Sequence, residues 1–373
     1  MTPPKILVTG ATGQTGGVVV SQLLEAGYPV RAMVRREDQR SVALKARGVE
    51  IAVADMCDAE RVNAAMQGVQ RAYWLPPYDP SMLEGAAVFA AAAKDAKLES
   101  IVSLSQWLAS PSHPAFLTRQ HWVADRLFAA LPGIALTMVT PGFFADVPYL
   151  VTIGMAAHLG VYPWLFGDSE TAPPSILDIG RVAAAALMDP AQHGGRTYRP
   201  TGPEVLSGSK IAGILGKVFD RQVRLVPLPF KLFLKAAHLA GQPMALLSNM
   251  EYYGEEHRRG AFAMGAPNDD VERATGRRAE TFEELVRRHA TYPQNQRSAA
   301  NMRSELLRSL ILPFASTPNT KRYVKGLHLH APAAPKYCGE SEIWRREHGF
   351  APAGHGAPAS RASTSSPISL KAS

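Results

Sequence analysis

The feature that most constrains this chain is a glycine-rich turn near its N-terminus, between a short apolar run and a segment with helical spacing. The turn is Gly10-Ala11-Thr12-Gly13-Gln14-Thr15-Gly16, and the apolar run before it is Lys5–Thr9. A second apolar run, Val30–Val34, follows at the distance that one β-α-β unit requires. We therefore predict a strand, a phosphate-binding turn, a helix and a parallel strand, which together form a dinucleotide-binding unit.

Each glycine of the turn has its own physical role. Gly10 permits the tight turn, Gly13 lets the backbone approach a pyrophosphate, and Gly16 allows close packing of the helix on the strand. Backbone N–H groups at the helix N-terminus would bind the pyrophosphate, and nearby polar side chains would reach the cofactor. The alternative is a glycine-rich turn without a ligand. The cofactor-binding residues predicted in this turn are Gly10, Thr12, Gly13, Gln14, Thr15 and Gly16.

The residue after the second apolar run selects between the two nicotinamide cofactors. An acidic residue there would bind the ribose 2′-hydroxyl of NAD, whereas this chain has Arg35. A guanidinium suits a 2′-phosphate through paired, charge-assisted hydrogen bonds. We therefore expect NADP(H) to be favoured over NAD(H), the alternative being a solvated arginine at the start of a helix. Asp55 follows the third apolar run, where it contacts the adenine or caps the next helix.

Strand-like and helix-like segments alternate through the first half of the chain. Six apolar runs separated by helical stretches imply parallel strands joined by right-handed crossovers. We predict an α/β fold with a doubly wound, Rossmann-type parallel sheet. The NAD(P)-binding core spans residues 1–142, and residues 143–293 supply the remaining Rossmann elements and a small, mostly helical substrate lobe. The predicted strands are 5–9, 30–34, 49–54, 72–75, 101–105 and 135–139.

The composition changes in residues 294–373. This segment holds 11 of the 40 basic and 4 of the 32 acidic residues, so it carries +7 of the net charge of +8. We interpret it as a basic, low-complexity and largely disordered tail with one plausible helix over Asn301–Leu312. Because the body is then nearly neutral, it has no electrostatic footprint for direct nucleic-acid binding.

Composition also bears on the compartment and on metals. Two cysteines far apart in sequence indicate a reducing compartment. The chain has neither a signal-peptide pattern nor about 20 uninterrupted apolar residues, so we expect a cytoplasmic protein without a membrane partner. No metal site is expected. The tail residues whose spacing fits no standard zinc pattern are His328, His330, Cys338 and His348.

In addition to the first motif, an ordered set of short motifs over residues 4–291 resembles the NmrA-like family of atypical short-chain dehydrogenases/reductases. That resemblance implies an NADP-preferring Rossmann domain with a small C-terminal substrate lobe. It also implies either a quinone- or isoflavone-type reductase or a redox sensor that acts through a protein partner. The further matching segments are Val30–Arg35, Ser103–Ser105, Thr137–Phe144, Asp178–Ala183, Thr201–Glu204 and Thr281–Glu284.

The usual catalytic pair of the wider group is missing. Its Tyr-x-x-x-Lys motif uses the tyrosine as a general acid, but no tyrosine of this chain has a lysine four residues later. In many NmrA-like reductases a Lys or His four residues before a Glu stands near the nicotinamide. His121 matches that position, although Asp125 replaces the glutamate. The resemblance thus implies that His121 orients the nicotinamide ribose or donates a proton, as an imidazolium beside a developing oxyanion. The alternative is a structural histidine bonded to Asp125.

The carboxyl ends of the predicted strands indicate where a ligand would bind. Leu75, Ser105 and Pro141 come at such ends, and we assign them to the cofactor site. Aromatic residues nearby would form a pocket for a planar ring, the alternative being ordinary core packing. We expect hydride transfer from NADPH to a quinone or another planar conjugated carbonyl. A cofactor-sensing regulator is the main alternative, and a nucleotide-sugar epimerase is a third. The predicted substrate-pocket residues are Tyr78, Trp107, Phe143 and Phe144, with Trp74 beside them.

Overall fold

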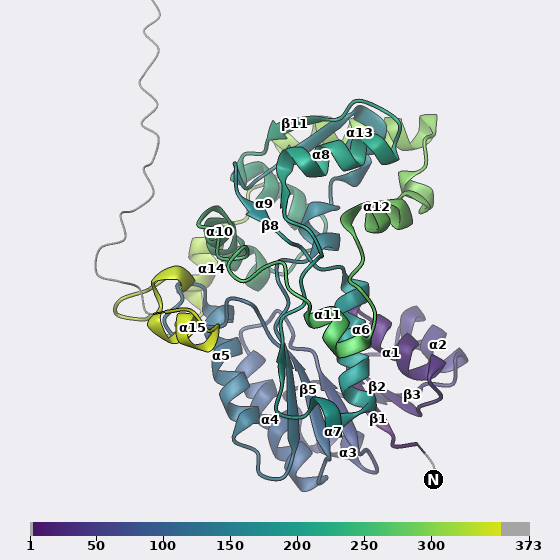
Figure 1. Cartoon of the computed structure of the whole chain (residues 1–373), viewed down its shortest axis with the longest axis vertical. Helices are drawn as coiled ribbons and strands as arrows, with labels where there is room; N and C mark the ends of the chain where they lie inside the picture. Colours follow the sequence, from purple (N-terminus) through teal and green to yellow (C-terminus); the bar gives the residue numbers. More distant parts are fainter. Residues whose placement is uncertain (1–2, 352–373) are drawn as a thin grey trace, which may run out of the picture.

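The computed structural model describes residues 3–351 and is built on a seven-stranded parallel sheet (Figure 1). The spatial order is β3-β2-β1-β4-β5-β6-β9. The chain order reverses between β1 and β4, which places a topological switch point at their carboxyl ends. This confirms the predicted α/β, Rossmann-type doubly wound fold. The strands are β1 (Ile6–Thr9), β2 (Val30–Val34), β3 (Glu50–Val53), β4 (Arg71–Trp74), β5 (Ser100–Leu104), β6 (Ala135–Val139) and β9 (Thr197–Tyr198).

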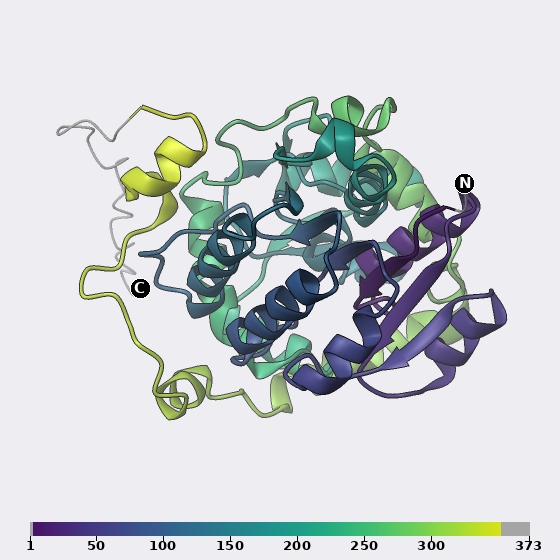
Figure 2. The same ribbon diagram turned by 90° about the horizontal axis from the view of Figure 1, so that it is seen from below.

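Helices cover both faces of the sheet, and each face has its own apolar core (Figure 2). Within β1, Ile6 and Val8 belong to one core and Leu7 to the other, because successive strand side chains point to opposite faces. The first core packs against α1 (Gln14–Glu25), α2 (Gln39–Ala46) and α6 (Ile176–Met188). The second packs against α3 (Ala59–Met66), α4 (Met82–Asp95) and α5 (Phe116–Ala129).

The rest of the body forms a small lobe on the carboxyl-end side of the sheet (Figure 1). Two short two-stranded sheets and several helices surround a third apolar core. The lobe contains η1 (Ala145–Tyr149), η2 (Met155–Leu159), β7 (Val161–Trp164), β8 (Glu170–Thr171), β10 (Leu206–Ser207), α8 (Gly208–Val218), β11 (Arg224–Pro227), α9 (Phe230–Leu239), α10 (Met244–Arg258) and α12 (Phe282–Ala290). Two short helices, α7 (Pro190–His193) and α11 (Asp270–Thr275), pack instead against α6 and the edge of the parallel sheet.

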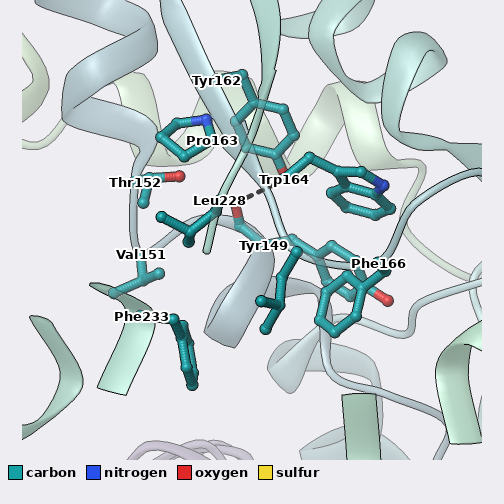
Figure 3. Close-up of a pocket in the computed structure, with 10 residues that line it drawn as sticks. Tyr149, Val151, Thr152, Tyr162, Pro163, Trp164, Phe166, Leu228 and Phe233 are labelled. Carbon is teal, nitrogen blue, oxygen red and sulfur yellow. Dashed lines mark hydrogen bonds between the residues drawn. The ribbon is translucent and has the colours of Figure 1, made fainter. Parts of the chain in front are cut away.

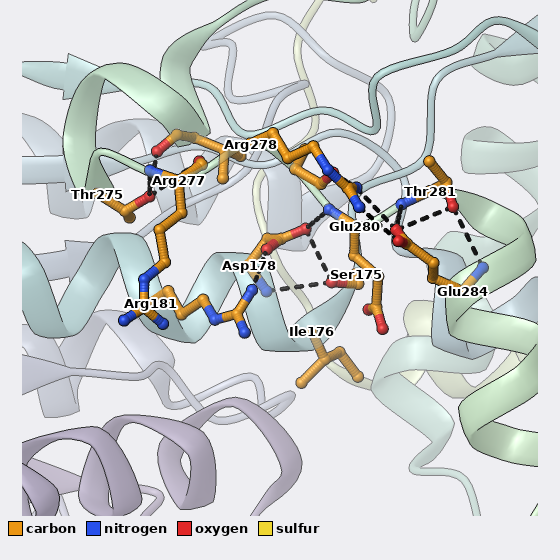
Figure 4. Close-up of polar contacts among 12 residues, drawn as sticks. Ser175, Ile176, Asp178, Arg181, Thr275, Arg277, Arg278, Glu280, Thr281 and Glu284 are labelled. Carbon is orange, nitrogen blue, oxygen red and sulfur yellow. Dashed lines mark hydrogen bonds and ion pairs between the residues drawn. The ribbon is translucent and has the colours of Figure 1, made fainter.

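A buried carboxylate joins α6 to the entry of α12 (Figure 4). Asp178 accepts hydrogen bonds from the backbone N–H of Glu280 at 2.7 Å and from the Ser175 hydroxyl at 3.1 Å. Arg181 pairs with the same carboxylate at 3.1 Å. Next to it, Thr281 and Glu284 form a capping box that begins α12. These bonds tie the last helix of the lobe to the Rossmann core.

Residues 294–351 differ from the expectation of a largely disordered tail. Besides α13 (Ala299–Ile311), which agrees with the helix expected over 301–312, they form α14 (Thr320–Gly326), α15 (Glu342–Glu347) and the short turns η3 (Pro293–Asn295), η4 (Leu312–Phe314) and η5 (Cys338–Glu340). Trp344 and Cys338 are fully buried. The Trp344 indole N–H donates to the carbonyl of Trp107 at 2.8 Å. A few buried side chains such as Trp344 and Cys338 fix this polar segment to the body. The average composition of a segment does not show that single residues in it are buried. The remaining tail residues, 352–373, lie outside the described part.

We expect Trp344→Ala to lower the free energy of unfolding by about 3–5 kcal/mol, because the substitution leaves a cavity where a fully buried indole packed. Truncation after Pro293 removes the same anchor and has an effect of at least similar size. Truncation after Ala351 serves as the matched control and leaves stability unchanged. Urea denaturation followed by tryptophan fluorescence and circular dichroism measures all three. Equal stability of the Pro293 truncation and the full chain would show that the segment is not part of the fold.

Candidate active site

The glycine turn brings the start of α1 against the ends of β1 and β4. Gly10 has a positive φ of 60°, and a Cβ at Gly16 would lie 2.2 Å from the Gly10 carbonyl oxygen. The Thr9 hydroxyl accepts the backbone N–H of Leu75 at 2.7 Å, which fixes the turn to the strand beside it. Gly13 is the N-cap of α1 and offers no side-chain cap. The first amides of α1 are therefore available to an anion.

One large cleft of about 900 Å³ runs from this turn along the carboxyl ends of the strands into the small lobe. It brings together all the predicted site residues except Gly16, which is packed beneath the turn against Gly10. Of the aromatic residues considered, Trp74 does not line the cleft. Its ring lies in the core 4.8 Å from that of Phe89 and 5.5 Å from that of Phe128, measured between centroids. The expectation for Trp74 is therefore wrong.

A second, much smaller cavity of about 20 Å³ adjoins the cleft inside the lobe (Figure 3). Tyr149, Tyr162 and Trp164 line it, and the Tyr162 hydroxyl donates to the Tyr149 carbonyl at 3.1 Å. Val151 and Phe233 line both spaces. The small cavity has room for about one water molecule, so the large cleft is the candidate for an organic ligand.

Three arginines gather where β2 ends in the cleft. The Arg40 guanidinium donates to the Asp38 carboxylate at 2.6 and 3.0 Å, which lowers the pKa of that carboxyl. Arg35 and Arg36 are exposed and make no hydrogen bond to any described residue. Because Arg40 is already paired within its own turn, Arg35 and Arg36 are the guanidinium groups available to an anionic ligand there.

Asp55 lines the same end of the cleft, and one of its two predicted roles can be rejected. Its carboxylate accepts the backbone N–H of Cys57 at 3.0 Å within the loop after β3. The N-cap of α3 is instead Asp58, whose side chain accepts the backbone N–H of Arg61 at 3.1 Å. The alternative that Asp55 caps the next helix is therefore wrong, and its other carboxylate oxygen remains available to a ligand.

His121 and Asp125 are both buried on α5, but they do not bond to each other. The Asp125 carboxyl accepts the Ser105 hydroxyl at 2.6 Å, and no hydrogen bond among the described residues involves the His121 ring. The bond that the structural alternative for His121 requires is thus absent among the described residues. Burial lowers the pKa of His121 to about 3 and raises that of Asp125 to about 7. His121 therefore faces the cleft as a neutral imidazole, which corrects the expected imidazolium.

The lobe supplies a polar group to the cleft that sequence reasoning missed. The Thr118 hydroxyl donates to Gln106 Oε1 at 3.0 Å, and Gln106 Nε2 donates to the Tyr253 hydroxyl at 3.0 Å. Tyr253 is buried on α10, and burial raises its pKa, so it stays protonated. Tyr253 lies 147 residues from Gln106 in the chain, so no local signal joins them. Further lining residues from the lobe are Phe233, Leu247, Met250 and Phe262.

One group among residues 3–351 has the side-chain types of a metal site. His113, Glu256 and Cys338 are fully buried, and their ligand atoms lie within 4.8 Å of one another. His113 Nδ1 accepts the backbone N–H of Ala115 at 3.0 Å, so Nε2 carries the ring proton and donates to Glu256 at 3.0 Å. A metal-binding histidine would instead donate from its other nitrogen. We interpret the group as hydrogen-bonded packing that joins the C-terminal segment to α10.

The NmrA-like family model matches residues 2–123 of this chain. Over 292 residues the chain is 31% identical to an NAD(P)H azoreductase of Xenophilus azovorans, covering 76% of this chain and 98% of that protein. Over 286 residues it is 32% identical to a (4-alkanoyl-5-oxo-2,5-dihydrofuran-3-yl)methyl phosphate reductase of Streptomyces griseus, with the same coverages of 76% and 98%.

Solved structures agree with the sequence matches. The fold resembles that of an NADPH-dependent quinone oxidoreductase from Escherichia coli in complex with NADPH, with a TM-score of 0.66 and 25% identity. That comparison covers 76% of this chain and 99% of the other. A triphenylmethane reductase of Citrobacter, with a TM-score of 0.65 and 23% identity, shares the fold. The glycine turn, the doubly wound sheet and these matches show that the chain belongs to the NmrA-like family.

Proposed function

We propose that this protein is an NADPH-dependent oxidoreductase that passes a hydride to a quinone or another planar conjugated acceptor. The observation that carries the proposal is the single cleft, which has a phosphate-type turn and arginines at one end and an apolar, aromatic pocket at the other. The azoreductase and the quinone oxidoreductase to which the chain is similar act with nicotinamide cofactors on such compounds. The proposed substrate is therefore a small molecule, and no protein partner is needed.

The residues of the cleft fit a dinucleotide. The uncapped start of α1 at Gly13 would hold the pyrophosphate, and a side chain at Gly10 would collide with Leu75. Arg35 would bind the 2′-phosphate, which favours NADP(H) over NAD(H). Asp55 would contact the adenine, and Ser105 and Pro141 would lie beside the nicotinamide half. The proposed division has residues 1–142 as cofactor core and 143–293 as remaining Rossmann elements and substrate lobe.

When bound, NADPH supplies the hydride. With that hydride and one proton a quinone would become a hydroquinone, and the cofactor would be left as NADP⁺. Tyr253 accepts a hydrogen bond from Gln106, which leaves its own O–H to be donated. We assign Tyr253 as the donor to the substrate oxygen and His121, as a neutral N–H donor, to orientation of the nicotinamide ribose.

Cys57 and Cys338 are both free thiols, in keeping with a location in the reducing cytoplasm.

The direct test is NADPH oxidation by the purified full-length protein with a panel of quinones and azo dyes, followed by loss of absorbance of the reduced cofactor. We expect turnover with at least one planar acceptor and a lower KM for NADPH than for NADH. Tight NADPH binding without turnover on any acceptor would overturn the proposal and favour the cofactor-sensing regulator.

Arg35→Ala is expected to weaken NADPH binding by about 10- to 100-fold and to leave NADH binding nearly unchanged, because only NADPH has the 2′-phosphate. Isothermal titration with each cofactor measures both affinities. Arg61→Ala removes an exposed guanidinium outside the cleft and is the matched control. An equal loss of affinity for both cofactors would show that Arg35 does not read the 2′-phosphate.

Tyr253→Phe is expected to lower kcat with a quinone by about 100-fold, because one hydrogen-bond donor to the developing oxyanion is lost. The affinity for NADPH should not change. Tyr252→Phe changes the neighbouring tyrosine, which does not line the cleft, and serves as the control. If the two variants retain the same kcat, another group or water protonates the substrate.

Asp125→Asn and His121→Asn should shift the pH dependence of stability in opposite directions. Because the folded pKa of Asp125 is raised to about 7, its stabilising contribution is present below pH 3.8 and lost as pH rises to about 7. Because the folded pKa of His121 is lowered to about 3, its contribution is present above pH 6.5 and lost as pH falls. Relative to the wild type, Asp125→Asn therefore gains stability with rising pH, by up to about 4 kcal/mol, and His121→Asn gains it with falling pH.

Urea denaturation at about pH 4.5 and about pH 7.5 measures these differences. The exposed Glu60→Gln on α3 is the control and should follow the wild type at both pH values. If the difference in the free energy of unfolding between the wild type and each of Asp125→Asn and His121→Asn is the same at both pH values, the assigned protonation states are wrong.

A further inference from the structure

Helix α13 and the turn η4 present large apolar side chains to solvent. Leu310 is 68% exposed and Phe314 is 90% exposed. Soluble proteins expose such side chains singly, and a contiguous set of them marks an interaction site. The set, which we call the α13 face, is Met302, Leu306, Leu307, Leu310, Ile311 and Phe314.

The side of α13 that packs against the body is polar. Asn301, Glu305 and Ser309, spaced four residues apart on one face, are half-buried, and Glu305 lies against Gly154 beside η2. A surface helix of a globular protein normally does the reverse and buries its apolar face. This orientation exposes the apolar side of α13 at the outer end of the small lobe, away from the parallel sheet (Figure 1).

Positive charge lies on α13 and on the neighbouring α9. Arg297 just before α13 and Arg303 and Arg308 within it are exposed, whereas Glu305, the one acidic residue of α13, is half-buried. The neighbouring α9 touches η4, where Lys235 donates to the carbonyl of Pro313. Helix α9 adds Lys231 and the exposed Leu239, and it has no acidic residue. Apolar side chains among basic ones are the pattern of a helix that lies in the interface of an anionic membrane.

The other possible occupants fit less well. In a symmetric dimer the same basic patch would face itself, and like charges repel. The sequence of residues 352–373 contains Arg361 and Lys371, no acidic residue, and only Ile368 and Leu370 as large apolar side chains. It therefore offers little charge or apolar complement to this face.

We propose that the α13 face docks this protein on an anionic lipid surface, with the apolar side chains inserted between headgroups and the basic residues paired with phosphates. No helix among residues 3–351 is long and apolar enough to cross a bilayer, and interfacial docking needs none. The proposal replaces the expectation of no membrane partner, and it goes beyond the proposed function without depending on it.

The test is co-sedimentation of the full-length protein with vesicles of phosphatidylcholine alone and with phosphatidylglycerol added. We expect at least about 10-fold stronger partitioning onto the anionic vesicles, weakened by salt. The double variant Leu310→Glu and Phe314→Glu should lose at least about 10-fold of this partitioning. The double variant Val42→Glu and Val123→Glu, which adds the same two negative charges at exposed positions of α2 and α5, is the control and should bind as the wild type does.

Turnover with a water-soluble quinone and NADPH affinity are measured on the same variants. Both should be unchanged, because Leu310 and Phe314 lie outside the cleft, and this separates failure of docking from failure of the proposed function. Equal partitioning of the wild type and the double variant would overturn the proposal. So would a concentration-dependent dimer in light scattering that the double variant abolishes, since the face would then bind a second copy.

Discussion

The closest backbone approach in the glycine turn determines how the rest of the molecule is placed. A Cβ at Gly16 would lie 2.2 Å from the Gly10 carbonyl, so only glycine lets α1 start so near β1. That placement aligns α1 with α6, where Gly180 makes a second close approach: a Cβ there would lie 2.4 Å from Val18. Two glycines thus set the distance between the sheet, α1 and α6. Asp178 on α6 then fixes the start of α12 through Glu280, so the same constraint reaches the lobe.

The sequence predicts the Rossmann half of the molecule well because its signals are local. Each predicted strand overlaps an observed one, and the helices α1, α2 and α3 are followed by Gly27, Gly48 and Gly68 with positive φ. Such turns depend on the glycine itself and not on distant contacts. The lobe is different. Helix α10 has no clean apolar stripe, since buried Asn249, Glu256 and His257 alternate with Leu247 and Met250. Its helical state depends on partners brought from elsewhere in the chain, which a local pattern cannot show.

In the candidate site too, some features follow from local sequence and others depend on the packed structure. Local motifs predict which residues would face a cofactor, and the cleft contains all of them except Gly16. Their protonation states depend on burial, which is a property of the packed structure. His121 and Asp125 are one helical turn apart, and a sequence argument pairs them as cation and anion. In the structure the Ser105 hydroxyl donates to the Asp125 carboxyl. Burial lowers the pKa of His121 and raises that of Asp125, which favours the neutral form of each group. This helix therefore carries two separate groups instead of an ion pair: a neutral imidazole at the cleft and a carboxyl that accepts the Ser105 hydroxyl.

The C-terminal segment contributes to the wall of the cleft through its contact with Trp107. Trp344 follows the glycine turn and the lobe helices at a large distance in the sequence, on α15. Its indole N–H holds the carbonyl of Trp107, and the Trp107 indole in turn donates to the carbonyl of Ala261 at 2.9 Å. Trp107 lines the cleft. One wall of the cleft is therefore held by a C-terminal residue that lies 237 residues from Trp107 in the chain. The glycine turn follows from a local motif, whereas the shape of the cleft at Trp107 depends on packing from the C-terminal segment.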